Sequence, residues 1–206
     1  MEVLSQAVLN DFAALLSVRF SRNVFTTEDS IRYTLYASLL RSGISPDRII
    51  VEHRHPAIPG AEVDTVILDA AGNLAAAIEF KYNRPIPSGR NLPLPQAAGN
   101  LFRDIFRLAA FKNVAFRYFV YLTSRELAQY LSNSARGLDC FFDLPEGKEI
   151  ALDEAVFKNC PQTFHRQMER RTDNVKLRSL ISKPCPGENF LRVYRIESVA
   201  QTAAGV

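Results

Sequence analysis

Apolar positions in the first part of the chain follow the spacing of helices, and those that come next follow the spacing of strands. Leu4, Val8, Phe12 and Leu15 recur every three or four residues. This pattern is typical of one buried helical face and predicts an N-terminal helix over residues 2–20.

A second helix is predicted to begin after Thr26 and Thr27, which can cap it, and to stop at Gly43. At about 100° per residue, Glu28 falls on the line of the apolar side chains of this helix, and Arg32 lies about 40° away. A Glu in the first turn can simply cap the helix and pair with an Arg four residues later. The alternative is that Glu28 is a carboxylate aimed inward at a site.

Three strands are predicted next, over residues 48–54, 63–69 and 74–82. The last two are separated by Ala-Ala-Gly-Asn at residues 70–73, a short connection typical of a hairpin turn. We therefore expect these two strands to pair in antiparallel fashion.

The second half of the pattern begins with a loop over residues 83–95, which contains four prolines and one glycine. Helical spacing returns over residues 96–112, and aromatic and β-branched residues over 114–123 indicate a buried strand. Another helix is expected from Ser124. The signals then weaken, with a helix predicted near 153–171 and a strand over 189–197.

This order predicts an α/β fold in which a mixed central sheet is flanked by helices. The helix, three strands, helix and strand form a core over about residues 27–123, with the N-terminal helix 2–20 before it and a C-terminal extension, 124–206, after it. At 206 residues, and without a convincing linker, residues 1–206 are expected to form a single domain.

Composition narrows the class of protein. With 47% hydrophobic and 23% charged residues, the chain is typical of a soluble globular protein. The N-terminus lacks a targeting pattern and no apolar run is long enough to span a membrane, so a cytoplasmic protein is expected. The spacing of Cys160, His165 and Cys185 matches no common zinc site, and buried or inert thiols are the simpler interpretation.

Charge is unevenly distributed although the net charge is only +3. Residues 1–80 carry a net charge of −4, whereas residues 84–125 and 158–195 each carry +6. Basic segments beside an acidic one suit a polyanion held at a metal site. An ordinary solvated surface is the alternative interpretation.

Two carboxylates are predicted to meet on the hairpin. A turn at residues 70–73 places Asp64 opposite Glu79, with Lys81 one step further along the same face. Opposed carboxylates repel unless positive charge lies between them, which Lys81 or a divalent cation would supply. Mg²⁺, for which Mn²⁺ can substitute, prefers such oxygen ligands and activates water for attack on a phosphodiester.

Asp64 followed by Glu79-Phe80-Lys81 resembles the D…(D/E)xK signature of the PD-(D/E)XK nuclease superfamily, and the order of elements resembles its αβββαβ restriction-endonuclease-like core. Val63 stands where the signature has proline. The resemblance implies that Asp64 and Glu79 bind Mg²⁺, that Lys81 positions or activates water, and that Glu28 joins the metal site. It also implies a polar contact from Gln96 near the metal or the scissile phosphate.

The resulting hypothesis is a metal-dependent nuclease, most simply a DNA endonuclease, in which basic side chains hold the nucleic acid. The residues expected to bind nucleic acid are Gln96, Arg32, Arg84, Arg90 and Arg103. Two alternatives remain open from the sequence: a catalytically inactive nucleic-acid-binding protein with the same fold, and a protein-interaction scaffold whose charges pair internally. The sequence also leaves open a homodimer.

Overall fold

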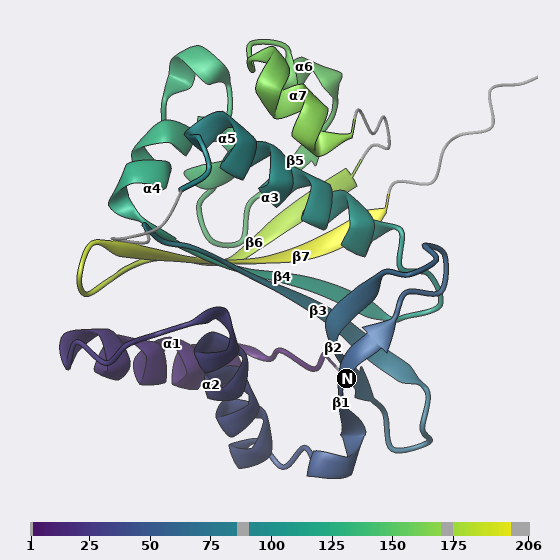
Figure 1. The fold of residues 1–206 in the computed structure, drawn as a ribbon. Helices are drawn as coiled ribbons and strands as arrows, with labels where there is room; N and C mark the ends of the chain where they lie inside the picture. The colour runs from purple at the N-terminus through teal and green to yellow at the C-terminus, as the bar shows by residue number, and fades with distance from the viewer. Residues whose placement is uncertain (1, 86–90, 170–174, 199–206) are drawn as a thin grey trace, which may run out of the picture.

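The computed structural model describes residues 2–85, 91–169 and 175–198. Its centre is a seven-stranded mixed sheet with helices on both faces (Figure 1). The strands lie in the order β1-β2-β3-β4-β7-β6-β5, and every neighbouring pair is antiparallel except β3 and β4, which are parallel. The predicted α/β class with a mixed sheet is confirmed.

The strands of this sheet come from both halves of the chain. Their bounds are β1 Ile49–Arg54, β2 Glu62–Leu68, β3 Leu74–Asn83, β4 Phe116–Ser124, β5 Glu149–Leu152, β6 Val175–Cys185 and β7 Asn189–Ser198. The first four and β7 agree with the predicted strands to within two residues. Strands β5 and β6 were not predicted, and they extend the same sheet beyond β7.

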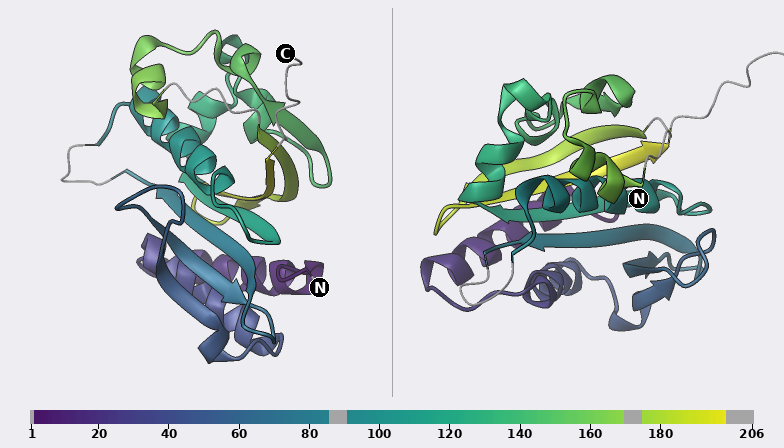
Figure 2. Two further views of the ribbon diagram at one scale, coloured as in Figure 1. Left: turned by 90° about the vertical axis from the view of Figure 1, so that its right-hand side faces the viewer. Right: turned by 45° about the horizontal axis from the view of Figure 1, so that its top comes forward.

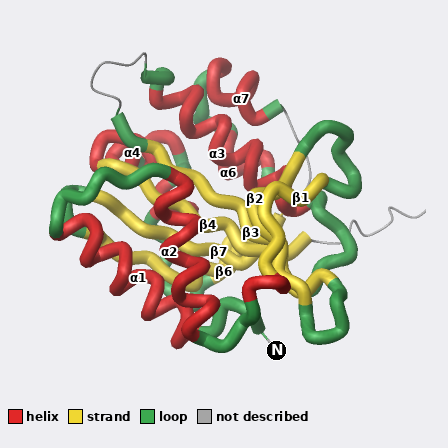
Figure 3. The backbone as a smooth tube through the Cα atoms, turned by 60° about the horizontal axis from the view of Figure 1, so that its bottom comes forward, coloured by secondary structure: helices red, strands yellow, loops and turns green. Residues whose placement is uncertain are grey.

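Helices divide between the two faces of the sheet (Figure 2). Helices α1 (Gln6–Ser21) and α2 (Glu28–Arg41) lie across one face, as Figure 3 shows from below. The other face is covered by the remaining α-helices: α3 Leu94–Ala109, α4 Arg125–Leu131, α5 Asp139–Phe142, α6 Glu154–Phe157 and α7 Gln162–Met168. Short 3-10 turns occur at η1 (Pro46–Arg48) and η2 (Ser134–Arg136).

The alternation of side chains along the strands explains the two cores. Ile78 and Phe80 of β3 pack toward α1 and α2, and Ala77 packs toward α3. Because successive side chains of a strand point to opposite faces, Glu79 and Lys81 share the face of Ala77. The charged stripe of β3 therefore lies on the side of the sheet covered by α3.

Helix α2 begins and ends where its sequence predicts. Thr27 and Ser30 form a capping box, in which each side chain accepts a hydrogen bond from the backbone amide of the other residue. After the helix, Gly43 adopts a φ of +89°, which a glycine adopts readily. The defined start of α2 fixes the position along β3 that the side chain of Glu28 faces.

Helix α3, at Leu94–Ala109, starts two residues and ends three residues before its predicted bounds of 96–112, and two further helices also differ from their predicted bounds. Helix α1 begins at Gln6 rather than residue 2, because the Ser5 side chain caps it by accepting a hydrogen bond from Val8. The helix predicted over 153–171 is two short helices, α6 and α7, since Pro161 lacks the amide hydrogen that a continuous helix needs. Residues 170 and 171 of that prediction lie outside the described residues.

The β2–β3 hairpin has the predicted register. Asp69 orders its turn by accepting hydrogen bonds from the backbone amides of Ala71 and Asn73. The ladder then runs from Leu68 paired with Leu74 to Thr65 paired with Ile78, with one irregularity between Ile67 and Leu68. One step beyond the last pair, this register brings Asp64 to Glu79.

None of the helices within the described ranges combines the length and the apolar character that crossing a bilayer requires.

Candidate active site

Two carboxylates take the place of a neighbouring strand along the open edge of β3. The β2–β3 ladder ends at Ile78, so the next backbone amides of β3 need other acceptors. The amide of Phe80 donates to Asp64 Oδ2 at 2.8 Å, and the amide of Tyr82 donates to Glu28 Oε2 at 2.8 Å. Both carboxylates are thereby fixed against the strand that carries Glu79 and Lys81.

Glu28 faces inward, as its position on the predicted helix indicated. Although it lies in the first turn of α2, its side chain reaches β3 rather than capping its own helix. Arg32 follows the same face and is only 8% exposed. The structure therefore brings both residues to the edge of β3 beside Asp64.

Asp64 is neutralised by Arg32. Its Oδ1 atom lies 2.6 Å from Arg32 Nη2, which forms a largely buried ion pair. Arg32 also lies 3.5 Å from the exposed Asp29. The sequence predicted Lys81 as the positive charge next to Asp64, whereas the structure gives Asp64 a closer cation from α2.

Asp64 and Glu79 meet as the hairpin register predicts. The backbone amide of Asp64 lies 3.4 Å from Glu79 Oε2, at the point where the two strands separate. Glu79 lies next to Ala77 and Phe119 of the apolar layer, the latter through its pairing with β4. Two carboxyl groups thus converge in a partly buried space at the start of the open edge.

Lys81 has a different partner from the one predicted. Its ammonium nitrogen lies 2.7 Å from Asp104 Oδ2 on α3, and Asp104 is only 4% exposed. The nearest nitrogens of Arg103 and Arg107 each lie 3.6 Å from Asp104 Oδ1. Asp104 therefore gathers three cations beside the carboxylates of β2 and β3.

Asp104 is the residue that sequence reasoning missed as part of the site. In the sequence it was noted as the single acid in a basic segment and was assigned no role. A stronger signal was its spacing, because it lies between Leu101 and Leu108 on the buried face of α3. A lone acid on an apolar helical face needs a buried cationic partner, and Lys81 is that partner.

Burial and crowding of like charges raise the pKa of Glu79 to about 8. Desolvation is the main cause, followed by the negative charges of Asp64 and Asp104, while Arg107 acts in the opposite direction. Burial also raises the pKa of Glu28, against the hydrogen bond from Tyr82. Near neutral pH, Glu79 is consequently protonated, mainly because its buried position disfavours the charged form.

Lys81 stays charged in this environment. Burial alone would lower its pKa, but the charge and hydrogen bond of Asp104, together with Glu28 and Glu79, raise it above the ordinary lysine value. The ammonium group therefore provides fixed positive charge and hydrogen-bond donors, and it is not a base.

The oxygen donors suit a hard divalent cation held by few protein ligands. Mg²⁺ is commonly bound by one or two carboxylates, with water and phosphate completing its shell. Asp64 and Glu79 lie close enough for the Asp64 carboxylate to raise the pKa of Glu79, so they could provide such a pair, and a bound cation would favour loss of the Glu79 proton. Glu28 is engaged at Tyr82, and no group of three or more His, Cys, Asp or Glu among the described residues is arranged to hold an ion.

The three residues that the sequence offered as zinc ligands are separate in the structure. Within the described ranges, Cys160, His165 and Cys185 do not form a metal-binding group. Cys160 is buried, with its Sγ 3.8 Å from the carbonyl oxygen of Arg136, and burial raises its pKa to about 11. A buried thiol with a raised pKa carries little thiolate at neutral pH, which makes Cys160 a poor nucleophile and a poor metal ligand.

Among the described residues, the arginines predicted to bind nucleic acid have separate partners in the fold. Arg32 is occupied by Asp64, and Arg103 lies beside Asp104 and 3.9 Å from Glu169. Arg84 stacks over the exposed ring of Phe25 at 4.4 Å. Gln96 is partly exposed in the first turn of α3, and Arg90 lies outside the described residues.

Comparison of the chain with protein-family models, with curated proteins and with solved structures gave no significant match.

Proposed function

We propose that this protein is a Mg²⁺-dependent nuclease that hydrolyses phosphodiester bonds of nucleic acid, with DNA as its substrate. The observation that carries the proposal is the convergence of Asp64 and Glu79 on adjoining strands, where Glu79 Oε2 lies 3.4 Å from the backbone amide nitrogen of Asp64 and the Asp64 carboxylate raises the pKa of Glu79, with Lys81 held nearby by Asp104. The D…ExK pattern, its place on a hairpin and the observed αβββαβ order support the resemblance to PD-(D/E)XK nucleases.

Asp64 and Glu79 would hold the metal ion in this proposal. When bound, Mg²⁺ neutralises charge on the phosphodiester and lowers the pKa of its bound water. Arg32 and the amide of Phe80 hold the Asp64 carboxylate in place, so little reorganisation is needed on binding. Glu28 keeps the end of β3 in position through Tyr82 and adds negative charge to the site.

Lys81 stabilises the negative charge that develops as water adds to phosphorus and the bond to the leaving oxygen breaks. Asp104 accepts a hydrogen bond from the ammonium group of Lys81, which restricts the directions in which this group can donate its other hydrogens. A preorganised charge of this kind contributes more than a mobile one because it needs no rearrangement during the reaction. Asp104 is a positioning residue and does not need to touch the substrate.

A catalytically inactive nucleic-acid-binding protein is the second candidate. The observation that favours it is internal neutralisation: both oxygens of Asp64 already accept hydrogen bonds, and Lys81 is paired with Asp104. In that account the charged cluster stabilises the open edge of β3 and nothing more. The two candidates differ in cleavage and agree in salt-sensitive binding of nucleic acid.

Cleavage assays decide between them. The purified chain is incubated with single- and double-stranded DNA and RNA, with Mg²⁺, with Mn²⁺ or with chelator. We expect metal-dependent cleavage of DNA that falls about 100-fold in Lys81→Met, since one fixed charge at a transition state is worth that much. Lys176→Met, which removes an exposed lysine paired with Glu149, is the matched control and should cleave normally. Binding without cleavage under every condition would support the inactive alternative.

A further inference from the structure

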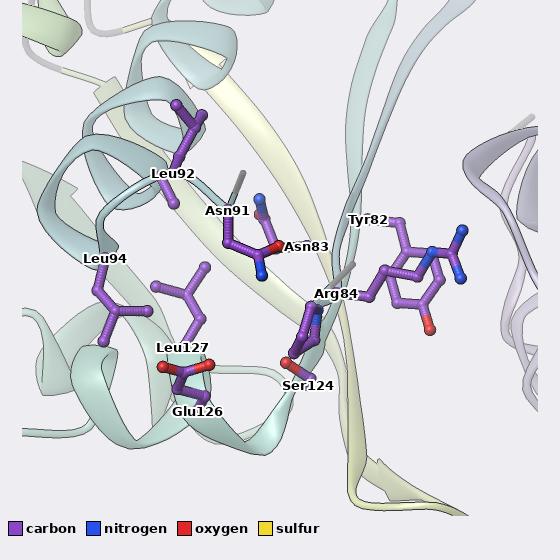
Figure 4. A pocket seen from close by; sticks show the side chains of 11 residues that line it. Tyr82, Asn83, Arg84, Asn91, Leu92, Leu94, Ser124, Glu126 and Leu127 are labelled. Carbon is purple, nitrogen blue, oxygen red and sulfur yellow. The ribbon is translucent and has the colours of Figure 1, made fainter. Parts of the chain in front are cut away.

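A pocket of about 250 Å³ lies beyond the candidate active site, where the parallel strands β3 and β4 end (Figure 4). Asn83 ends β3, and Ser124 ends β4 immediately before α4. The carboxyl ends of neighbouring parallel strands are where α/β sheets commonly bind ligands. The pocket is separate from the carboxylate cluster, because none of the acidic residues of that cluster lines it.

Strand β3 connects the pocket to the candidate active site. Asn83 follows Lys81 by two residues and Glu79 by four, so the three side chains share one face of the strand. At about 3.3 Å per residue, Asn83 is about 13 Å from Glu79 along β3. That span corresponds to about four stacked nucleotides at 3.4 Å each. A nucleic-acid strand bound at the active site can therefore reach the pocket.

The lining has an apolar wall and several polar side chains, among them the acceptor groups of Asn83 and Glu126. Leu92, Leu94 and Leu127 form the wall, and Figure 4 shows the amide of Asn83 opposite them. The Asn83 amide oxygen is buried and has no hydrogen-bond partner among the described residues. The carboxylate of Glu126 is the second acceptor.

The charges favour a base over a phosphate as the occupant. Glu126 would repel a phosphate group, whereas a carboxylate readily accepts hydrogen bonds from the amino group of a nucleobase. Arg84, the one cation on the described lining, turns away and stacks on Phe25. A nucleobase offers two apolar faces for the leucines and N–H donors on its edge for Asn83 and Glu126.

We propose that this pocket receives one unstacked nucleobase of the nucleic acid bound at the active site. The inference rests on the proposed function and names a subsite for it. Asn83 and Glu126 accept hydrogen bonds from the edge of the base, and the leucines contact its faces. Only a base that has left the stack can enter, so the pocket favours single-stranded or locally opened nucleic acid.

The probe is a single-stranded DNA of 20 nucleotides with 2-aminopurine at one position, moved along the strand in successive oligonucleotides. Binding is followed by fluorescence in chelator, so that no strand is cut. A matching duplex and 2-aminopurine nucleoside monophosphate are separate arms.

The variants are Asn83→Leu, which removes the amide, and Ser124→Phe, which fills the pocket. Ser124 makes no side-chain cap to α4, so this change sacrifices no such hydrogen bond.

The account predicts a fluorescence change at one position of the strand, and about tenfold weaker binding when that base is absent. Asn83→Leu and Ser124→Phe should remove the change, whereas Asn159→Leu, an exposed site outside the lining, should not. Thermal unfolding identifies any variant that fails to fold, and the abasic oligonucleotide tests the proposal on the unaltered protein.

An equal fluorescence change at every position of the oligonucleotide would contradict the proposed base-binding role of the pocket, and so would variants that give the same change as the unaltered protein. Neither result would contradict the proposed nuclease function. Equal affinity for the free nucleotide and the strand would also overturn a subsite for polymeric nucleic acid. If the protein neither binds nor cuts any nucleic acid, the proposed function itself is wrong, and the subsite falls with it.

Discussion

The ammonium group of Lys81 lies 2.7 Å from the carboxylate of Asp104, although 23 residues separate the two in the sequence. Strand β3 carries the first and helix α3 carries the second, so this ion pair joins the sheet to the helix layer above it. It also fixes the lysine that the proposed chemistry needs. The same contact therefore links the stability of the fold to the proposed catalysis.

Removal of the carboxylate of Asp104 should destabilise the fold. In Asp104→Asn, Lys81 keeps its charge in a partly buried place without its closest partner, which should cost about 2–4 kcal/mol of unfolding free energy. Urea denaturation measures the loss. Glu149→Gln, which breaks the exposed pair with Lys176, should leave the midpoint unchanged. Equal effects from the two substitutions would mean that the Lys81–Asp104 pair is no more important than a surface contact.

The raised pKa of Glu79 predicts a pH-dependent cost to stability. Between the ordinary pKa of 4.5 and about 8, the unfolded chain has lost this proton and the folded chain retains it. The folded state then binds more protons, so its stability falls as the pH rises through this window and is level above it. Glu79→Gln lacks this cost and should gain stability over the unaltered protein from pH 4.5 to 8.

Chelator-treated protein should be used for this measurement, with unfolding free energies compared at half-unit steps of pH. The gain of Glu79→Gln should reach on the order of a few kcal/mol at pH 8. Glu154→Gln changes an exposed carboxylate, so its unfolding free energy should vary with pH in the same way as that of the unaltered protein. A Glu79→Gln curve that is also parallel would show that Glu79 titrates normally.

Gly99 allows α3 to pack closely against α7. A Cβ atom at this position would lie 2.5 Å from the carbonyl oxygen of Phe164 and 2.7 Å from Cβ of Gln167. Gly99→Ala should therefore destabilise the protein by about 1–3 kcal/mol, despite the gain of about 1 kcal/mol from helix propensity. Thermal unfolding shows whether Gly99→Ala raises or lowers the stability of the protein. A more stable Gly99→Ala variant would show that α7 does not lie so close to the helix that carries Asp104.

The part of the site formed by local structure could be predicted from the sequence. The register of the β2–β3 hairpin follows from its short turn, and it brings Asp64 to Glu79. The inward direction of Glu28 follows from its place on the wheel of α2, whose start is fixed by Thr27. Each relation depends only on the geometry of one helix or one hairpin.

The partners of the charged groups could not be predicted in the same way. The pairs Arg32–Asp64 and Lys81–Asp104 depend on how α2 and α3 pack against opposite faces of the sheet. Side-chain alternation placed Lys81 on the correct face and left open which of the nearby acids it meets. Strands β5 and β6 were missed for a different reason: β5 has only four residues, and β6 contains charged residues and a proline that weaken its strand pattern, although it pairs with β7 across a short turn.

Binding of Mn²⁺ tests the central claim most directly, because it addresses Asp64 and Glu79 without requiring a substrate. Electron paramagnetic resonance counts free and bound Mn²⁺, and a pH indicator records proton release in the same titration. We expect one bound ion per chain, with release of the Glu79 proton at pH 7 because its pKa is about 8. Asp64→Asn and Glu79→Gln should abolish the binding, and Glu149→Gln should retain it. Unaltered Mn²⁺ binding in Asp64→Asn and Glu79→Gln, or none in the original protein, would contradict the account.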